Sequence, residues 1–252
     1  MDLTTLTVPI PGSHKGQNGR LLIIGGSELF HAAGLWALEV ASRIVDLVHY
    51  SSIPENNASV KKEFRNGIVV PRSDIKAYIE EDDAILIGPG MTRDHETEEL
   101  TNTLFKKYPQ KQWVIDAGSL QMMDVSLIPK NAILTPHHAE FARVFGSADI
   151  SDVAKKYHCI ILLKGERDIA ASPTEMKVIE GGNEGMTKGG TGDVLAGLIA
   201  ALACKNDPFL ATIAGSFINK KAGDELYKTV GPFFNASDLA AQIPRTMKSL
   251  LG

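Results

Sequence analysis

The chain has 252 residues, 44% hydrophobic and 22% charged, with a formal net charge of −4. This composition is typical of a globular domain, and the small negative charge excludes the broad basic surface with which proteins bind nucleic acid. No apolar run reaches membrane-spanning length, and the two cysteines have no metal or disulfide spacing. We therefore expect a cytoplasmic protein without a targeting segment that binds neither nucleic acid nor a membrane.

Short apolar and β-branched segments alternate with helical patterns along the chain. The strand patterns cover residues 20–26, 47–52, 67–70, 83–87, 113–116, 132–135 and 159–164, then 169–172 and 176–179, which flank a turn as in a hairpin. The helical patterns cover residues 32–46, 96–107, 139–145, 152–157, 191–204 and 208–227. This order predicts an α/β fold with a central, mostly parallel sheet flanked by helices, and without a linker or a repeat we expect a single domain over residues 1–252.

A glycine-rich turn at residues 181–193 leads directly into one of the expected helices. It holds six glycines, and Thr191 or Asp193 could cap the helix. Free amides at a helix N-terminus attract phosphate oxygens, and glycine lets the backbone approach them closely. Asp193 repels phosphate, so a carboxylate there needs a purpose, such as accepting a hydroxyl proton. The alternative is a plain glycine-rich connection.

Four other turns follow expected strands. They are Gly25-Gly-Ser27, Gly88-Pro-Gly90, Thr135-Pro-His137 and Lys164-Gly165. Ligands of open α/β sheets bind at the carboxyl ends of the strands, so these loops could share one crevice. Each could also be a tight turn only, and Lys164 could reach a phosphate or merely extend from a strand end.

Four motifs, in this order, resemble those of the NAD(P)H-hydrate dehydratase family, a branch of the ribokinase-like superfamily. They lie at residues 14–27, 88–91, 134–143 and 183–193. The resemblance implies a three-layer ribokinase-like fold. It also implies dehydration of hydrated NADH or NADPH, in which ADP or ATP phosphorylates the ring hydroxyl and Mg²⁺ balances the charge of the donor. The metal ligands stay open.

Site residues follow from this resemblance position by position. Asp193 would be catalytic and would face the ring hydroxyl, and the N-terminus of its helix should make it a weaker base, which favours orientation of the hydroxyl as much as proton abstraction. The substrate would also contact Ala33, Gly90 and His137. The nucleotide would be held by Lys164, Gly165, Glu166, Arg167, Asp168, Asn183, Gly185, Met186, Thr187, Gly189, Gly190, Thr191 and Gly192.

The chain departs from the family pattern at several positions. Gly118 stands where relatives commonly have a second acidic residue, although Asp116 is kept. The other departures are Ala139, Glu184 and Lys188. Lys188 could add positive charge for the phosphates or be an exposed loop residue. Glu140 could cap its own helix or reach a metal through water.

Two other functions remain open from the residues alone. A ribokinase-like kinase that phosphorylates a hydroxyl of a vitamin precursor or sugar would use the same loop and Asp193, and a nucleotide sensor would bind without turnover. An apolar helix surface around Leu35 and Trp36 predicts a homo-oligomer. The resemblance also implies a partnership with a separate NAD(P)H-hydrate epimerase, since no epimerase domain is expected here.

Overall fold

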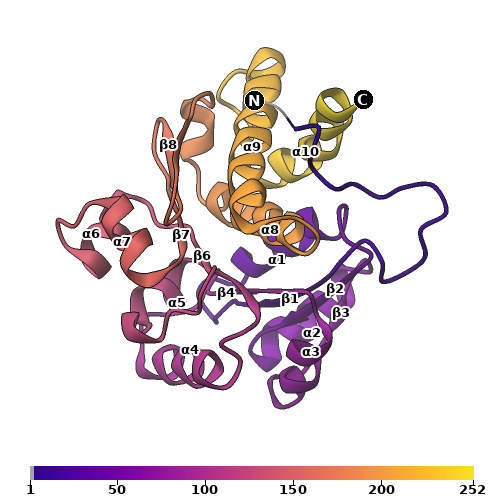
Figure 1. Ribbon diagram of the computed structural model, residues 1–252. Helices are drawn as coiled ribbons and strands as arrows, with labels where there is room; N and C mark the ends of the chain where they lie inside the picture. Colours follow the sequence, from indigo (N-terminus) through magenta and orange to yellow (C-terminus); the bar gives the residue numbers. More distant parts are fainter. Residues whose placement is uncertain (1–2) are drawn as a thin grey trace.

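A nine-stranded sheet, in the order β3-β2-β1-β4-β5-β6-β7-β8-β9, runs through the computed structural model, which describes residues 3–252 (Figure 1). Strands β1 to β7 pair in parallel, whereas β8 pairs antiparallel with β7 and β9. The strands are β1 (Arg20–Ile24), β2 (Leu47–Ser51), β3 (Ile68–Val69), β4 (Ala84–Ile87), β5 (Gln112–Ile115), β6 (Ile133–Leu134), β7 (Ile160–Leu163), β8 (Asp168–Ala171) and β9 (Met176–Ile179).

The central strands are apolar on both faces because helices cover both sides of the sheet. In β1, Leu21 and Ile23 point into one hydrophobic core, and Leu22 and Ile24 point into the other. All four side chains are fully buried. The alternation of side chains along a strand therefore divides one apolar sequence between two cores.

Helices form the outer layers. They are α1 (Ala33–Ala41), α2 (Pro54–Glu63), α3 (Ile75–Glu81), α4 (His95–Lys107), α5 (Ala117–Met122), α6 (His138–Phe145), α7 (Ile150–Tyr157), α8 (Thr191–Ala203), α9 (Pro208–Val230) and α10 (Ala236–Leu251), with short 3₁₀ turns at Arg72–Asp74, Val125–Leu127 and Glu184–Thr187. Helices α1, α8, α9 and α10 cover one face, and α3 to α7 cover the other (Figure 1).

The predicted fold class is confirmed, and each of the nine expected strands is present among residues 3–252. The helix expected over residues 32–46 was too long, because its regular part ends at Ala41. Helices α2, α3, α5 and α10 were not predicted. Helix α2 is mostly polar, and α10 contains Pro244, which lacks the amide that a helix interior needs; it is nevertheless helical because Leu239 and Ile243 pack into the core.

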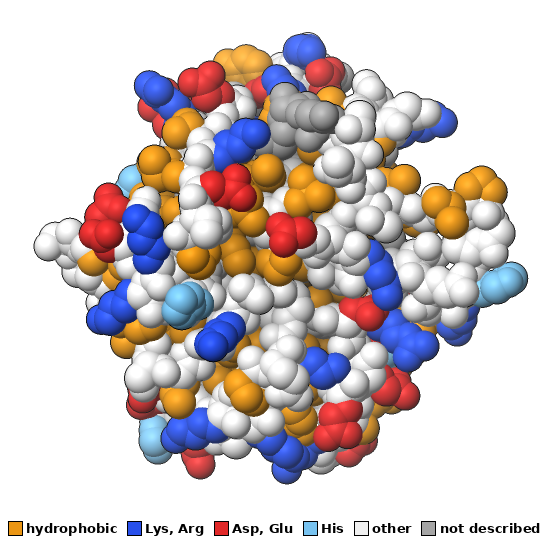
Figure 2. All heavy atoms as spheres, viewed as in Figure 1, with side chains coloured by type: hydrophobic (Ala, Val, Ile, Leu, Met, Phe, Trp, Pro, Cys, Tyr) orange, Lys and Arg blue, Asp and Glu red, His pale blue; other side chains and the backbone are white. Residues whose placement is uncertain are grey.

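The surface carries charges of both signs. Figure 2 shows lysine and arginine side chains interspersed with aspartate and glutamate over the visible face, without a large region of one sign. No helix within residues 3–252 is long and apolar enough to cross a bilayer.

Candidate functional site

The loops after the parallel strands meet at one edge of the sheet. The amide of Gly26 donates a hydrogen bond to the carbonyl of Pro89 over 2.7 Å. A Cβ atom at Gly88 would lie 1.8 Å from the carbonyl oxygen of Asp116, and Gly88 has a φ of +117°. Only glycine at position 88 allows the loop after β4 to pass so close to the backbone of Asp116, which follows β5. The loops after β1, β4 and β5 therefore pack closely together at the carboxyl ends of the strands, where a shared crevice was expected.

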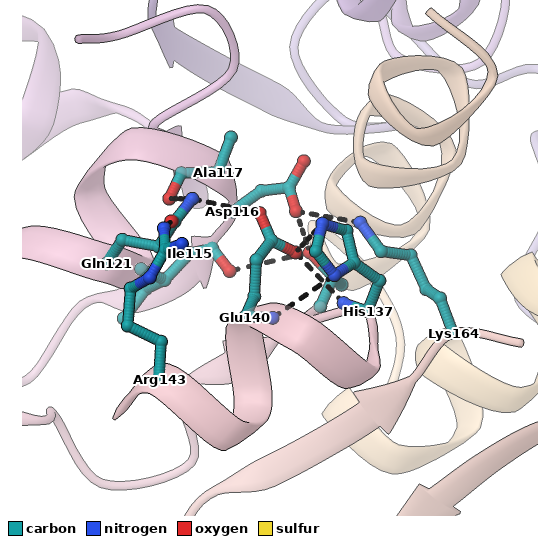
Figure 3. Close-up of polar contacts among 9 residues, drawn as sticks. Ile115, Asp116, Ala117, Gln121, His137, Glu140, Arg143 and Lys164 are labelled. Atoms are coloured by element: carbon teal, nitrogen blue, oxygen red, sulfur yellow. Dashed lines mark hydrogen bonds and ion pairs between the residues drawn. The ribbon is translucent and has the colours of Figure 1, made fainter. Parts of the chain in front are cut away.

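A buried ion pair lies at the centre of this edge (Figure 3). Lys164 Nζ is 3.1 Å from Asp116 Oδ1, which also accepts a hydrogen bond of 2.9 Å from Thr135 Oγ1. Burial acts to lower the pKa of Lys164, but the carboxylates of Asp116 and Glu140 outweigh burial and hold the pKa above its ordinary value. Lys164 is therefore a permanent cation at the base of the crevice.

Asp193 lies in the first turn of α8, beside this ion pair. Its pKa is raised to about 7, first by burial and then by the negative charge of Asp116, while Lys164 acts in the opposite direction. The expectation of a weaker base at this helix N-terminus was wrong, because desolvation and the nearby carboxylate outweigh the helix dipole. A carboxylate with a pKa near 7 is a suitable general base at neutral pH.

The start of α8 is built differently from the sequence expectation. Gly190 is the N-cap residue, with a φ of +93°, and no side chain caps the helix. Thr191 Oγ1 instead donates to the carbonyl oxygens of Met186 and Lys188, at 2.7 and 2.8 Å. Thr191 thus holds the preceding loop in place, and its own amide donates to the carbonyl of Lys188 at 3.4 Å, whereas no residue within 3–252 accepts from the amide of Gly192.

His137 is the N-cap of α6 and forms a capping box with Glu140. Its Nδ1 accepts from the amide of Glu140 at 3.1 Å, and the Glu140 carboxylate accepts from the amide of His137 at 2.9 Å. Gln121 Nε2 also donates to Glu140 at 3.1 Å (Figure 3). Of the two roles open for Glu140, capping is the one that the geometry supports.

A cavity of about 820 Å³ opens between these elements. Ten of the residues expected at the site line it: His137, Lys164, Gly165, Glu166, Asp168, Asn183, Met186, Thr187, Thr191 and Gly192. Its size is within the range of pockets that hold small molecules and cofactors. We call this cavity the nucleotide pocket, after the ligand that the sequence predicts for these residues.

Other expected site residues lie outside the lining of the nucleotide pocket. A Cβ at Gly185 would lie 2.4 Å from the Phe234 ring, and one at Gly190 would lie 2.5 Å from Trp36. These glycines are required by packing within the protein. Gly189 has open space around it, and the Arg167 guanidinium is 3.9 Å from the carboxylate of exposed Glu180.

Ala33 and Gly90 lie together at the neighbouring part of the edge. A Cβ at Gly90 would be 2.7 Å from the Cβ of Ala33 and 3.2 Å from the Cα of Gly26. The residues expected to bind the substrate therefore lie in two regions. Ala33 and Gly90 form one, and His137 lies in the other, in the wall of the nucleotide pocket.

Two of the family departures have structural explanations. Lys188 Nζ donates to the carbonyl of Pro232 and lies 5.3 Å from the centre of the Phe234 ring, so its charge is directed away from the nucleotide pocket. At Gly118, a Cβ would lie 2.2 Å from the carbonyl oxygen of Met91. The local backbone of this chain therefore excludes any side chain at position 118.

Asp168 has a structural role in addition to lining the nucleotide pocket. It accepts hydrogen bonds from Ser216 at 2.8 Å and from the amide of Gly165 at 3.0 Å, and it is 3.3 Å from Lys220 Nζ. Lys220 and its neighbour Asn219 also line the pocket, and neither was predicted. Helix α9 carries buried polar side chains at helical spacing, namely Thr212, Ser216, Asn219 and Lys220. This spacing in the sequence could have indicated that a polar face of α9 lies at the site.

No group of three or more His, Cys, Asp or Glu residues within the described part of the chain could hold a metal by itself. Mg²⁺ commonly binds through one or two carboxylates together with nucleotide phosphates. Asp116 supplies one such carboxylate at the base of the crevice. The donor set fits a metal that arrives with a nucleotide.

Leu35 and Trp36, expected to form a subunit surface, pack against the core of this chain. Trp36 Nε1 donates to Ser237 Oγ at 3.3 Å, which ties α1 to α10. Both side chains are only partly buried in this chain, and the homo-oligomer stays a prediction from the sequence.

Comparisons with known proteins agree with this geometry. A model of the family described as NAD(P)H-hydrate dehydratase matches residues 21–245. The ADP-dependent (S)-NAD(P)H-hydrate dehydratase of Nitrosopumilus maritimus is 33% identical over 94% of this chain and 91% of its own length. The bifunctional NAD(P)H-hydrate repair enzyme of Methanocaldococcus jannaschii is 36% identical over 98% of this chain and 52% of its own length. The chain thus spans about half the length of most curated relatives it matches.

Solved structures are similar over the whole fold. The ADP/ATP-dependent NAD(P)H-hydrate dehydratase of Bacillus subtilis, co-crystallized with ATP and Mg²⁺, has a TM-score of 0.83 and 26% identity, covering 96% of this chain and 93% of its own. A hydroxyethylthiazole kinase from Pyrococcus horikoshii has a TM-score of 0.66 at 15% identity, which indicates a shared fold only.

Proposed function

The chain belongs to the NAD(P)H-hydrate dehydratase family, and we propose that it uses ADP or ATP to remove water from hydrated NADH or NADPH. The observation that carries this proposal is the Asp193 carboxyl group, whose pKa is raised to about 7 beside Lys164. Such a group can accept a proton from a substrate hydroxyl at neutral pH. The reaction would restore the reduced dinucleotide from its damaged form.

Phosphorylation addresses the difficult step of the dehydration, because hydroxide is a poor leaving group and phosphate is a good one. The terminal phosphoryl group would pass from the nucleotide to the ring hydroxyl oxygen while the hydroxyl proton passes to Asp193. The C–O bond would then break with its electron pair on phosphate, assisted by the ring nitrogen, and loss of a proton from the neighbouring carbon would restore the reduced ring. The shorter nucleotide and inorganic phosphate are the other products.

The residues of the crevice would divide this work. The terminal phosphate would lie against Lys164 and the first amides of α8 at Gly192, where positive charge and free N–H groups meet. The rest of the nucleotide would occupy the nucleotide pocket. The hydrated dinucleotide would approach from the side of Ala33, Gly90 and His137, which places its hydroxyl at Asp193.

Mg²⁺ is part of the proposal as the ion that neutralises the phosphates of the donor. Asp116 is the carboxylate best placed to reach it, while the same side chain keeps Lys164 in position. We leave the remaining ligands to the phosphates and water.

We also propose a cytoplasmic location, from the state of the two cysteines. Cys159 and Cys204 are free and buried, which suits a reducing cytoplasm. A homo-oligomer and a separate epimerase stay predictions from the sequence and the family resemblance.

One incubation tests the function. The purified chain is mixed with hydrated NADH, MgCl₂ and either ADP or ATP, and reduced-nicotinamide absorbance and free phosphate are followed together. We expect both to rise in equal amounts, and the faster nucleotide identifies the donor. A stable phosphorylated product would indicate a kinase, and nucleotide binding without any product would indicate a sensor; either result would reject the proposal.

A further inference from the structure

One polar atom in the wall of the nucleotide pocket has no partner. Asn219 on α9 lines the pocket and is 3% exposed, and its Oδ1 receives no hydrogen bond from any residue within 3–252. A buried amide oxygen without a partner costs free energy, and such atoms in native proteins usually await a ligand or water. This carboxamide is therefore a candidate contact for the bound molecule.

The neighbouring polar side chains in the same wall are already engaged. Lys220 donates to the carbonyl oxygens of Gly165 and Glu166, at 3.2 and 3.1 Å. Asn183 Oδ1 accepts from the amide of Gly185 at 3.0 Å, which completes a turn of the loop. These side chains hold the wall together, and they have few free hydrogen-bond donors or acceptors left to bind a ligand.

Two further lining residues are used in the same way. Thr187 Oγ1 donates to the carbonyl of Glu184 at 2.8 Å, and the Glu184 carboxylate accepts from the hydroxyl of Tyr227 at 2.7 Å. Among the buried polar side chains of this wall, Asn219 thus stands out by its unused hydrogen-bonding capacity.

The chemistry of a carboxamide selects the part of the ligand that it can recognise. Anionic phosphates belong with Lys164 and the start of α8, where the positive charge lies. A neutral carboxamide presents one acceptor and one donor side by side, which matches the amino group and the adjacent ring nitrogen of adenine. Rotation of the amide by 180° exchanges its oxygen and nitrogen within the same volume, so the pair can align with the base.

We propose that Asn219 is the residue that selects adenine in the donor nucleotide, by accepting from its amino group and donating to a ring nitrogen. This inference rests on the proposed use of ADP or ATP and adds the residue that determines base specificity. At the edge that carries the amino group and N7 of adenine, hypoxanthine presents two acceptors, O6 and N7, so neither orientation of the Asn219 amide pairs with both atoms. The wild-type protein therefore prefers ADP to IDP.

The test compares ADP and IDP with the wild-type protein and Asn219→Leu, which has similar volume and no polar atoms. Calorimetric binding with MgCl₂ is measured first, and dehydration of hydrated NADH second. For Asn219→Leu we expect ADP binding to weaken by about 10- to 100-fold, the KM for ADP to rise with little change in kcat, and IDP binding to change by less than about 3-fold. The melting temperature without nucleotide should not fall, because a buried unpaired atom is removed.

Thr212→Val is the matched control. Thr212 is also buried on α9, but its hydroxyl already donates to the carbonyl of Pro208 at 2.7 Å. Its loss should lower the melting temperature and leave the ratio of ADP to IDP binding unchanged. Asn219→Ser repeats the measurement with a smaller side chain, should the leucine variant not fold.

The outcomes separate this inference from the proposed function. An ADP preference that is lost in Asn219→Leu supports the inference, even if neither protein dehydrates hydrated NADH, a result that would reject only the proposed function. A wild-type protein that binds ADP and IDP equally, or an Asn219→Leu variant that keeps the wild-type preference, overturns the inference while dehydration can still be observed.

Discussion

Replacing Asp193 by asparagine should reduce activity and increase stability at the same time. The carboxamide keeps the shape of the side chain but cannot accept the hydroxyl proton, so we expect kcat to fall by about 10²- to 10⁴-fold. ADP binding should be kept, since the phosphates would be held mainly by Lys164 and the amides of α8. In the wild-type protein, kcat/KM should rise with pH until it levels off above about pH 7, the pKa of Asp193.

The stability effect follows from the same pKa. Folding raises the pKa of Asp193 from an ordinary value of 3.8 to about 7. Below about pH 4, Asp193 is protonated in both the folded and the unfolded state and does not change the free energy of unfolding. As the pH rises from about 4 through 7, the unfolded state loses this proton more readily than the folded state, so the free energy of unfolding falls. The full difference corresponds to about 4 kcal/mol, and the partial exposure of Asp193 reduces our expectation to about 2 kcal/mol.

Urea unfolding of the wild-type protein and Asp193→Asn at pH 4.5 and pH 8 measures this effect. We expect nearly equal free energies of unfolding at the lower pH, and at pH 8 a variant more stable by about 2 kcal/mol. Glu99→Gln, at an exposed position of α4, is the control and should show no pH-dependent difference. A difference between wild type and Asp193→Asn that stays constant with pH would refute the reasoning.

Two further predictions concern residues that support the site. Lys164→Gln leaves the buried Asp116 carboxylate without its cation, so the free energy of unfolding should fall by about 3 kcal/mol in urea titrations; unchanged stability would contradict the role of the pair. Gly118→Ala places a Cβ 2.2 Å from the carbonyl oxygen of Met91 and should cost about 2 kcal/mol or more, whereas Gly189→Ala, with no atom within 4 Å, should change stability by less than about 0.5 kcal/mol. Equal melting temperatures of the two glycine variants would be the contrary result.

Hydrophobic patterning was sufficient to predict the strands and most of the long helices. The strands are short, apolar and separated by turn residues, so their local signal agrees with their final environment. Helix α2 was missed because it is mostly polar, and α10 was missed although Asn235 and Asp238 form a capping box at its start. Pro244 argues against a helix, yet burial of Leu239 and Ile243 outweighs the lost hydrogen bond.

The sequence predicted one shared purpose for the glycines of the site, ligand binding, whereas the structure gives them different reasons to be glycine. Gly192 lines the nucleotide pocket, whereas Gly185 and Gly190 are glycine because Phe234 and Trp36 occupy the space of a side chain. Sequence cannot separate these reasons, since both demand the same residue. The packing partner lies far along the chain and becomes visible only in the folded protein.

The class of the fold and the positions of the strands along the chain were predicted from the sequence, because both depend on short-range periodicity and on turns at strand ends. The order of the strands within the sheet, with β1 between β2 and β4, was decided by tertiary pairing. The basicity of Asp193 and the unpaired state of Asn219 were decided only by tertiary structure. A pKa depends on burial and on charges such as Asp116 that another strand brings near. An unsatisfied amide likewise depends on every atom around it, and no local pattern encodes that environment.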